Sequence, residues 1–179
     1  MLLIAIDPGK SGGIAIKPDN QPEVAWSMPD TDSGVIELID HIIPEYSTIQ
    51  ESKVCYMEKV SGFIGGRMQY MNCPTCRNSI AYRTGDPGKT MFTFGYGNGF
   101  LVSTFMTRKI KLEMVTPQKW MKGIGVGSKN GMGKTEWKRF LKDRASKWFP
   151  NIKVTLKTAD ALLILKYATI IHLNNQLPF

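Results

Sequence analysis

Short apolar runs alternate with turn residues along the first part of the chain. Leu2–Ile6, Gly13–Lys17 and Val24–Met28 are largely apolar, and they are separated by a glycine-rich turn and by the turn Pro18–Gln21. Short strands joined by tight turns pair with one another in antiparallel fashion. The pattern therefore predicts an antiparallel meander of three strands.

A helix and a fourth strand are predicted next. Apolar residues recur at helical spacing between Ser33 and Ile43, with Thr31–Ser33 as capping candidates and Pro44 as the expected stop. Lys53–Val60 returns to a strand pattern that is apolar through Met57 and then charged. Glu58 is therefore a charged residue at the end of a strand that is otherwise largely apolar.

The middle of the chain is predicted to be a long loop followed by a helix and a strand. Residues 61–89 are rich in Gly, Pro, Asn and Arg, and loops of this length are usually functional or mobile. Thr90–Lys109 is predicted to be a helix despite its glycines, because its apolar residues favour one. Ile110–Val115 is predicted to be a short strand.

The C-terminal part is predicted to be helical. Thr116 and Pro117 suit the cap and first position of a short helix, and a basic amphipathic helix is expected over Thr135–Phe149. A last helix is expected over residues 158–173. The order of elements predicts one α/β domain over residues 1–179, with a mixed five-stranded sheet flanked by helices and a loop insertion at about 61–89.

Positive charge is concentrated in one part of the chain. The formal net charge is +8, and the stretch from Lys119 to Lys147 holds nine Lys and Arg residues against Glu136 and Asp143. Such a stripe favours a polyanionic partner, with nucleic acid the commonest; an acidic membrane surface and a plain solvated helix face are the alternatives. The expected phosphate contacts are Lys119, Lys122, Lys129, Lys134, Lys138, Arg139, Lys142, Arg144 and Lys147.

The cysteines and the hydropathy pattern bear on location. The three cysteines form an odd count, and the opening apolar run is too short for a secretory segment because Asp7 interrupts it. No apolar run approaches the roughly 20 residues that cross a bilayer. We therefore expect a cytoplasmic protein with reduced cysteines and no membrane partner.

Cys73 and Cys76 form a Cys-x-x-Cys pair, "NCPTCRN", which is a spacing found in zinc knuckles. A zinc site needs four ligands, and beyond this pair the chain offers Cys55, His41 and His172. From the sequence we expect unligated thiols in a loop. A zinc site shared between two protomers is the alternative.

Three carboxylates stand at positions that favour a metal site. Asp7 and Glu58 each end a predicted strand, so they emerge at one sheet edge if those strands are parallel neighbours. Asp160 lies on the apolar stripe of the last helix. Clustered carboxylates repel one another unless a cation holds them ionised, and oxygen ligands suit Mg²⁺ or Mn²⁺. Taken singly, the same acids could serve a turn, an ion pair and a helix terminus.

Five short motifs in order resemble the RuvC-type Holliday junction resolvases, particularly their phage relatives, within the ribonuclease H-like fold. The motifs are "IAIDPGKSGGIAI", "YMEKV", "MFTFGYGNG", "VTPQKWMKGIGV" and "TADALLILKYA". The resemblance implies a structure-selective endonuclease that acts as a homodimer on four-way DNA junctions and uses two divalent metal ions. It places the catalytic, metal-binding acids on Asp7, Glu58 and Asp160.

The chain departs from the family pattern at one position. The family usually has an acidic or metal-binding residue one helical turn before the last acid, and this chain has Lys157 there. Lys157 is a candidate for orienting the attacking water or for stabilising phosphate charge, and its presence puts a second metal ion in question. The resemblance also suggests that the loop after Glu58 approaches the junction centre, with Phe63, Met68, Tyr70 and Met71 stacking on unpaired bases and Arg67 as a further DNA contact; packing of the loop on the core is the alternative.

The leading hypothesis is therefore a metal-dependent DNA junction resolvase. Two alternatives stay open. The first is a protein that binds branched DNA with weak or no catalysis because Lys157 has replaced a metal ligand. The second is a nuclease of the same fold that acts on RNA or on other branched DNA.

Overall fold

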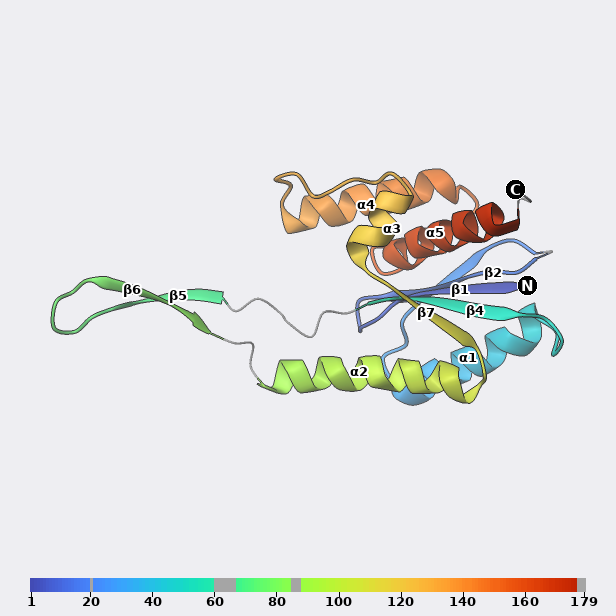
Figure 1. The fold of residues 1–179 in the computed structure, drawn as a ribbon, viewed down its shortest axis with the longest axis horizontal. Helices are drawn as coiled ribbons and strands as arrows, with labels where there is room; N and C mark the ends of the chain where they lie inside the picture. Colours follow the sequence, from blue (N-terminus) through green and yellow to red (C-terminus); the bar gives the residue numbers. More distant parts are fainter. Residues whose placement is uncertain (20, 60–66, 85–87, 177–179) are drawn as a thin grey trace.

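A mixed sheet of five strands forms the centre of the molecule (Figure 1). The computed structural model describes residues 1–19, 21–59, 67–84 and 88–176. The strand order is β3-β2-β1-β4-β7, in which β1, β2 and β3 are antiparallel neighbours while β4 and β7 run parallel to β1. The predicted meander and mixed sheet are confirmed. The strands are β1 (Leu2–Asp7), β2 (Gly13–Lys17), β3 (Val24–Ser27), β4 (Lys53–Glu58) and β7 (Lys111–Val115).

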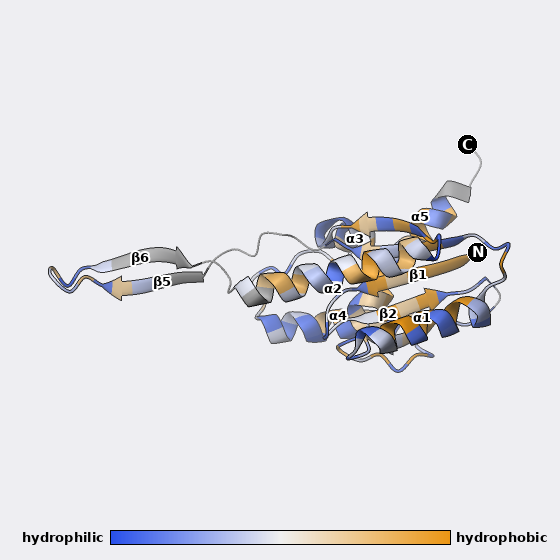
Figure 2. Cartoon of the chain, turned by 90° about the horizontal axis from the view of Figure 1, so that it is seen from below, coloured by the Kyte–Doolittle hydropathy of each residue, from blue (hydrophilic) through white to orange (hydrophobic). Residues whose placement is uncertain are grey.

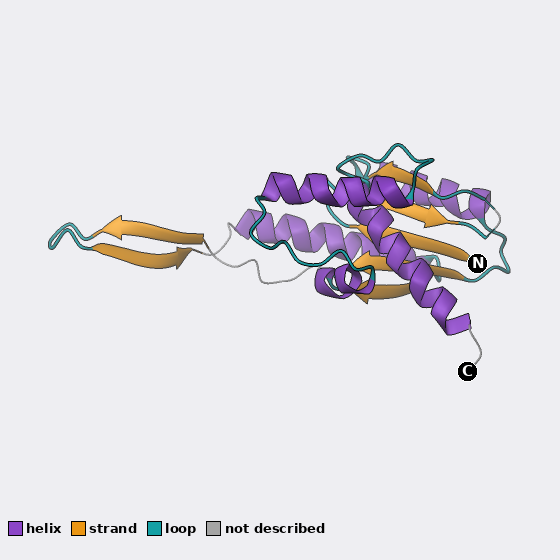
Figure 3. Cartoon of the chain, turned by 90° about the horizontal axis from the view of Figure 1, so that it is seen from above, coloured by secondary structure: helices purple, strands orange, loops and turns teal. Residues whose placement is uncertain are grey.

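Helices cover both faces of this sheet (Figures 1 and 3). One face packs against α1 (Asp32–Tyr46) and α2 (Gly88–Thr107). The other face carries α3 (Pro117–Gly123), α4 (Lys134–Trp148) and α5 (Ala159–Gln176). The chain is thus an α/β layer structure, because each face of an apolar sheet must be buried.

Alternation along the strands assigns side chains to the two faces. Leu2, Ile4 and Ile6 point toward α1 and α2, whereas Leu3 and Ala5 point toward α5. Figure 2 shows β1 and β2 in the hydrophobic colour, as expected for strands buried on both faces. The same alternation directs Asp7, which follows Ile6, toward the side of the sheet that α5 covers.

Small residues bring α5 close to the sheet. Ala5 and Ala15 are fully buried beneath it, and every residue over 161–165 is buried. Gly13 lies directly under the start of the helix, since a Cβ there would come within 2.8 Å of the Lys157 carbonyl oxygen. The backbone of β2 thereby fixes where α5 begins.

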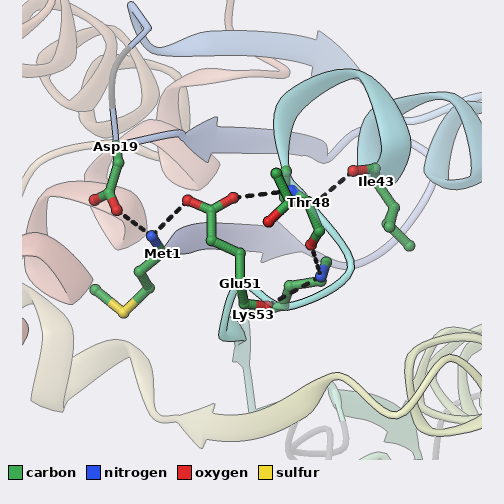
Figure 4. A network of polar contacts seen from close by, with 7 residues as sticks. Met1, Asp19, Ile43, Thr48, Glu51 and Lys53 are labelled. Carbon is green, nitrogen blue, oxygen red and sulfur yellow. Dashed lines mark hydrogen bonds and ion pairs between the residues drawn. The ribbon is translucent and has the colours of Figure 1, made fainter.

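A polar network links the segments at the N-terminal ends of β1 and β4 (Figure 4). The Met1 ammonium contacts Asp19 and donates to Glu51 at 2.8 Å. Glu51 also accepts from the Thr48 N–H at 3.0 Å, and Lys53 Nζ donates to the Thr48 carbonyl at 2.7 Å. These contacts join the starts of β1 and β4, so their register is held at the end remote from Asp7 and Glu58.

The prediction of an unstructured loop over 61–89 is wrong for part of that segment. Strands β5 (Arg67–Asn72) and β6 (Ser79–Thr84) form an antiparallel hairpin that stands apart from the five-stranded sheet in Figure 1. Both strands contain β-forming Tyr, Ile or Thr residues, but Gly, Pro and Asn nearby mask this signal in the sequence. Pairing across the hairpin supplies the backbone hydrogen bonds that a loop would leave to water.

Pro44 does not stop the first helix as predicted. Helix α1 continues to Tyr46 and includes Pro44 in its last turn. A proline at this position removes a single N–H from the ladder, and Ser47 Oγ donates to the Ile43 carbonyl at 2.6 Å near the helix end. Thr31 does act as the N-cap, accepting from the Gly34 N–H at 3.1 Å. Among the residues that the structure describes, none of the helices combines the length and apolarity needed to cross a bilayer.

Gly13→Ala is expected to destabilise the protein. The added Cβ would lie 2.7 Å from the Trp26 carbonyl oxygen and 2.8 Å from that of Lys157, and both are backbone atoms that cannot rotate away. We expect a loss of roughly 1–3 kcal/mol in the free energy of unfolding, measured by denaturant titration. Gly99→Ala is the control, because a Cβ there meets nothing within 4 Å. Equal stability of the two variants would contradict the close approach of α5 to β2.

Candidate active site

Asp7 and Glu58 end neighbouring parallel strands on the same face of the sheet. Ile6 pairs with Met57, so the next residue of each strand is one of these acids. The alternation that places Val54 and Tyr56 toward α5 also directs Glu58 there, as it does Asp7 after Leu3 and Ala5. Two carboxylates therefore emerge side by side at the carboxyl ends of β1 and β4.

Asp160 reaches this edge from the first turn of α5. The helix start is fixed by a reciprocal cap: the Thr155 N–H donates to Thr158 Oγ1 at 2.9 Å, and the Thr158 N–H donates to Thr155 Oγ1 at 3.2 Å. Asp160 is 7 % exposed. Its charge acts on both Asp7 and Glu58, so residues from three distant parts of the chain share one electrostatic site.

Lys138 of α4 supplies positive charge to the three acids. Its Nζ lies 2.5 Å from Asp160 Oδ2, and its ammonium also interacts with Asp7 and Glu58. The sequence predicted Lys138 as one of many phosphate contacts and missed this pairing. The sequence contained one hint of this pairing: Asp160 lies on an apolar helix stripe, and a buried acid needs a cationic partner.

Trp120 is a second residue of the site that the sequence did not single out. The indole is fully buried, and its Nε1–H donates to Glu58 Oε2 at 2.8 Å. A buried tryptophan needs an acceptor for its N–H. The Thr116 cap, which accepts from the Lys119 N–H at 3.3 Å, starts α3 so that Trp120 falls over the end of β4.

Burial and mutual repulsion raise the pKa values of Asp7 and Glu58 above their ordinary values. Burial raises the pKa of Asp7 to about 7, and the charges of Asp160 and Glu58 add to this effect while Lys138 opposes it. Burial also raises the pKa of Glu58, although the Trp120 N–H pulls it down. Burial by itself would lower the pKa of Lys138, but Asp160 raises it above the ordinary value. The site thus has more negative charge than one lysine balances.

The donor set fits a divalent cation by charge and chemistry. Carboxylate oxygens are the ligands preferred by Mg²⁺ and Mn²⁺, and Asp160 Oδ1 is a buried oxygen without a hydrogen-bond partner. The side chains are more widely spread than in a closed site: among the described residues, no three His, Cys, Asp or Glu groups are spaced to hold one ion. Lys138 supplies the compensating charge in the metal-free protein.

Lys157 shortly precedes Asp160 in the sequence, but its side chain is exposed to solvent. Its backbone carbonyl, rather than its ammonium, is the part that packs against Gly13. It comes directly before Thr158, the residue that caps α5. The catalytic role suggested for Lys157 stays a prediction.

The basic residues extend from the carboxylates along α4. Lys134, Lys138 and Lys142 recur every four residues and so share one side of the helix. Lys122 and Lys129 line a hollow of about 560 Å³ between α3, the following loop and Trp137. Lys119, Arg139 and Lys147 are exposed, whereas the Arg144 guanidinium lies 5.2 Å from the centre of the Phe140 ring. Solvent-facing cations thus surround the lysine that enters the site.

The residues predicted to approach DNA after Glu58 have different outcomes. Phe63 lies outside the described residues, and Arg67 is the first residue of β5. Tyr70 and Met71 are 72 % and 56 % exposed on the hairpin. Packing of these two side chains onto the core, the alternative reading of the sequence, is therefore wrong.

Comparison with known proteins gives structural likeness without sequence relatives. No protein-family model matches the chain, and no curated protein matches it. Thermus thermophilus RuvC in complex with a Holliday junction substrate is similar, with a TM-score of 0.48 and 10 % identity over 96 % of each chain. A second Thermus thermophilus RuvC structure gives a TM-score of 0.48 and 12 % identity over 96 % of this chain and 97 % of that chain. Likeness at this level decides nothing about activity.

Asp7→Asn is expected to stabilise the metal-free protein at pH 8. The unfolded chain releases the Asp7 proton near the ordinary pKa of 3.8, whereas the folded protein keeps it to about pH 7. Between these values the folded state binds more protons, so the free energy of unfolding falls as pH rises through this window and stays low above it. Each pKa unit corresponds to about 1.4 kcal/mol, and 1 kcal/mol raises Tm by about 2–4 °C for a chain of this size.

Thermal unfolding in EDTA at pH 5 and pH 8 measures this effect. The advantage of Asp7→Asn should be several degrees at pH 8 and should shrink toward pH 5, where Asp7 is protonated. Asp143→Asn removes an exposed carboxylate and should show no such pH dependence. The same advantage at both pH values would disprove the raised pKa.

Proposed function

We propose that this protein is an endonuclease that cuts branched DNA with a divalent metal ion and takes the four-way junction as its substrate. The observation that carries the proposal is the electrostatic interaction of three carboxylates, from β1, β4 and α5, beside a row of lysines on α4. Acids attract a divalent cation and lysines attract phosphate, and hydrolysis of a phosphodiester needs both at one place.

The protein groups have distinct parts in the proposed reaction. A Mg²⁺ or Mn²⁺ ion held by Asp7, Glu58 and Asp160 would acidify water and neutralise charge on the scissile phosphate. Trp120 holds Glu58 in place through its N–H, so this carboxylate keeps one orientation. Lys138 Nζ pairs with Asp160 Oδ2, and on leaving this carboxylate it would donate to a phosphate oxygen. Asp7 must release its proton to act as a ligand, so rising pH favours binding of the ion.

Binding is proposed to recognise the DNA backbone. Lys134 and Lys142 flank Lys138 by one helical turn on either side, so a strand following α4 would place its phosphates near the acids. Contacts of this type fix position and carry little sequence information. Recognition of a branched shape rather than a base sequence is the result that such contacts favour.

A homodimer is part of the proposal, because two symmetric cuts across a four-way junction require a two-fold axis. Helix α2 is the proposed contact, since Phe92, Tyr96 and Met106 are large apolar side chains that it exposes. The exposed Tyr70 on the hairpin offers a ring on which an unpaired base can stack.

One observation favours the alternative of a DNA-binding protein with weak catalysis. Lys138 neutralises Asp160 directly, and the described carboxylates are not gathered around a single point. If this ion pair persists on DNA, the basic surface would bind a junction that the acids do not cut. Incubation of a labelled four-way junction with Mg²⁺ or Mn²⁺ separates the two: binding without nicking favours the alternative. Parallel reactions with a Y-fork, a linear duplex and an RNA–DNA hybrid define the substrate.

Asp160→Asn is expected to abolish cleavage while leaving binding intact. The change removes one carboxylate ligand, and a loss of roughly 100-fold or more in cleavage rate is expected, since even outer-sphere partners cost 10–100-fold. The basic row on α4 is untouched, so junction affinity should stay close to that of the parent. Cleavage is measured with Mg²⁺, and affinity is measured by gel shift in EDTA.

Asp143→Asn is the matched control for this change. It removes the same charge from an exposed position on α4, on the helix that carries Lys138, and should cut at the parent rate. Parent-rate cleavage by Asp160→Asn would instead remove this residue from the catalytic site.

Lys134→Gln is expected to weaken junction binding in a salt-dependent way. The slope of log K against log salt concentration is negative, and each lost phosphate contact makes it less steep by about 0.9. Lys111→Gln removes a lysine that pairs with Glu113 at the start of β7, away from the acids, and should leave the slope unchanged. Affinities measured at four salt concentrations decide between them, and identical slopes for the two variants would rule out a phosphate contact at Lys134.

A further inference from the structure

The tip of the β5–β6 hairpin has an ordered turn that the proposed nuclease does not use. The last strand pair is Asn72 with Ser79, and the loop between them is closed by the Cys73 N–H donating to the Asn78 carbonyl at 2.9 Å. The Arg77 N–H donates to the Cys73 carbonyl at 2.8 Å. Arg77 has a φ of 59°, the left-handed conformation that reverses the chain directly after Cys76. The two cysteines thus belong to a folded turn.

The turn presents both sulfur atoms together. The Cys73 sulfur interacts with the backbone N–H groups of Cys76 and Thr75 and with the Cys76 thiol. These donors lower the pKa of the Cys73 thiol below its ordinary value. Thiolate is the form that binds metal, and N–H groups directed at a ligating sulfur orient and stabilise it. The sequence had indicated unligated thiols because spacing alone does not reveal this geometry.

Two sulfur ligands leave a tetrahedral site half complete. Zinc in structural sites takes four ligands, and four cysteines are a common set. Within the described residues, no group of three His, Cys, Asp or Glu side chains is placed to hold a metal ion. Cys55 is buried in β4, and His172 contacts the Tyr56 hydroxyl at 3.3 Å. Among the described residues the turn thus lacks two ligands, which a second molecule can supply.

The hairpin is suited to meet an identical hairpin. In Figures 1 and 3 it stands apart from the sheet and its helices, with the cysteine turn at its outer end. Cys76 is exposed and Cys73 is partly exposed. Two copies related by a two-fold axis would bring four equivalent sulfurs together. Arg77 is exposed and follows Cys76 directly in the sequence, so one positive charge per copy belongs to the turn that would carry a zinc tetrathiolate.

We propose that the turns of two copies of this chain bind one zinc ion between them through the four thiolates of Cys73 and Cys76. Each thiol releases a proton to solvent on binding, and no electron transfer is involved. The site joins two hairpins into one unit, independently of the carboxylates at the sheet edge.

Zinc content and mass test the proposal on the full-length, reduced protein. After loading with zinc chloride and desalting, the protein should retain about 0.5 zinc ion per chain, the ratio for a shared four-sulfur site. Light scattering, at a protein concentration at which the zinc-free protein is monomeric, should show an increase in mass on zinc addition that a chelator reverses. Cobalt in place of zinc should give the strong visible absorption of a tetrahedral thiolate complex.

Variants separate this site from the rest of the molecule. Cys73→Ser and Cys76→Ser should each lose the zinc, the cobalt spectrum and the zinc-dependent mass change, with thermal unfolding of the main body unchanged. Cys55→Ala is the control for the remaining cysteine and should keep all three signals. Asp160→Asn should also keep them, because its carboxylate belongs to the other site; failure of the nuclease and failure of the zinc site are thus distinguishable.

Several results would overturn the proposal. These are a ratio of one zinc per chain without a mass change, retention of zinc by Cys73→Ser, no zinc binding by the parent, and a Cys73–Cys76 disulfide that persists under reducing conditions.

Discussion

The placement of three carboxylates at the end of a buried sheet, against one lysine, is the constraint on which the rest depends. Asp7 and Glu58 end strands that are otherwise apolar, and Asp160 starts a helix whose next residues are all buried. Such charges are costly without a cation. Lys138 meets part of this need, and burial with mutual repulsion raises the pKa of Asp7 and Glu58. The site is therefore built to accept further positive charge.

Several contacts hold the backbone and side chains around the site in place. Reciprocal threonine caps fix the start of α5, Gly13 sets its distance from β2, and Trp120 holds Glu58. Contacts at the Met1 end hold the strand register from the opposite side. The caps of α5, the Gly13 contact and the Met1 network do not involve the acids, so these supports do not depend on the pairing of Asp160 with Lys138.

The hairpin is stabilised by different interactions from those that stabilise the five-stranded sheet. Its residues 70–79 are exposed or partly exposed, and it is held by backbone pairing and by the hydrogen bonds of the Cys73–Asn78 turn. Small elements that cannot build a core commonly gain stability from a metal or from association. The two proposed metal sites thus differ in position and in ligand type: carboxylates suit a hard cation at the ends of β1 and β4, and thiols suit a softer one at the hairpin tip.

Local sequence determined much of the fold, including the strand meander, the Thr31 and Thr116 caps and the strand-ending positions of Asp7 and Glu58. These features depend on apolar alternation and on single side chains contacting nearby backbone, so they are written in short segments. Tertiary structure alone decided that Lys138 pairs with Asp160, that Trp120 holds Glu58 and that Cys73 and Cys76 share one ordered turn. The first two contacts join segments 22 and 62 residues apart, and the third depends on strand pairing around it. Partner choice at such separations is set by how helices pack on the sheet, which no local pattern encodes.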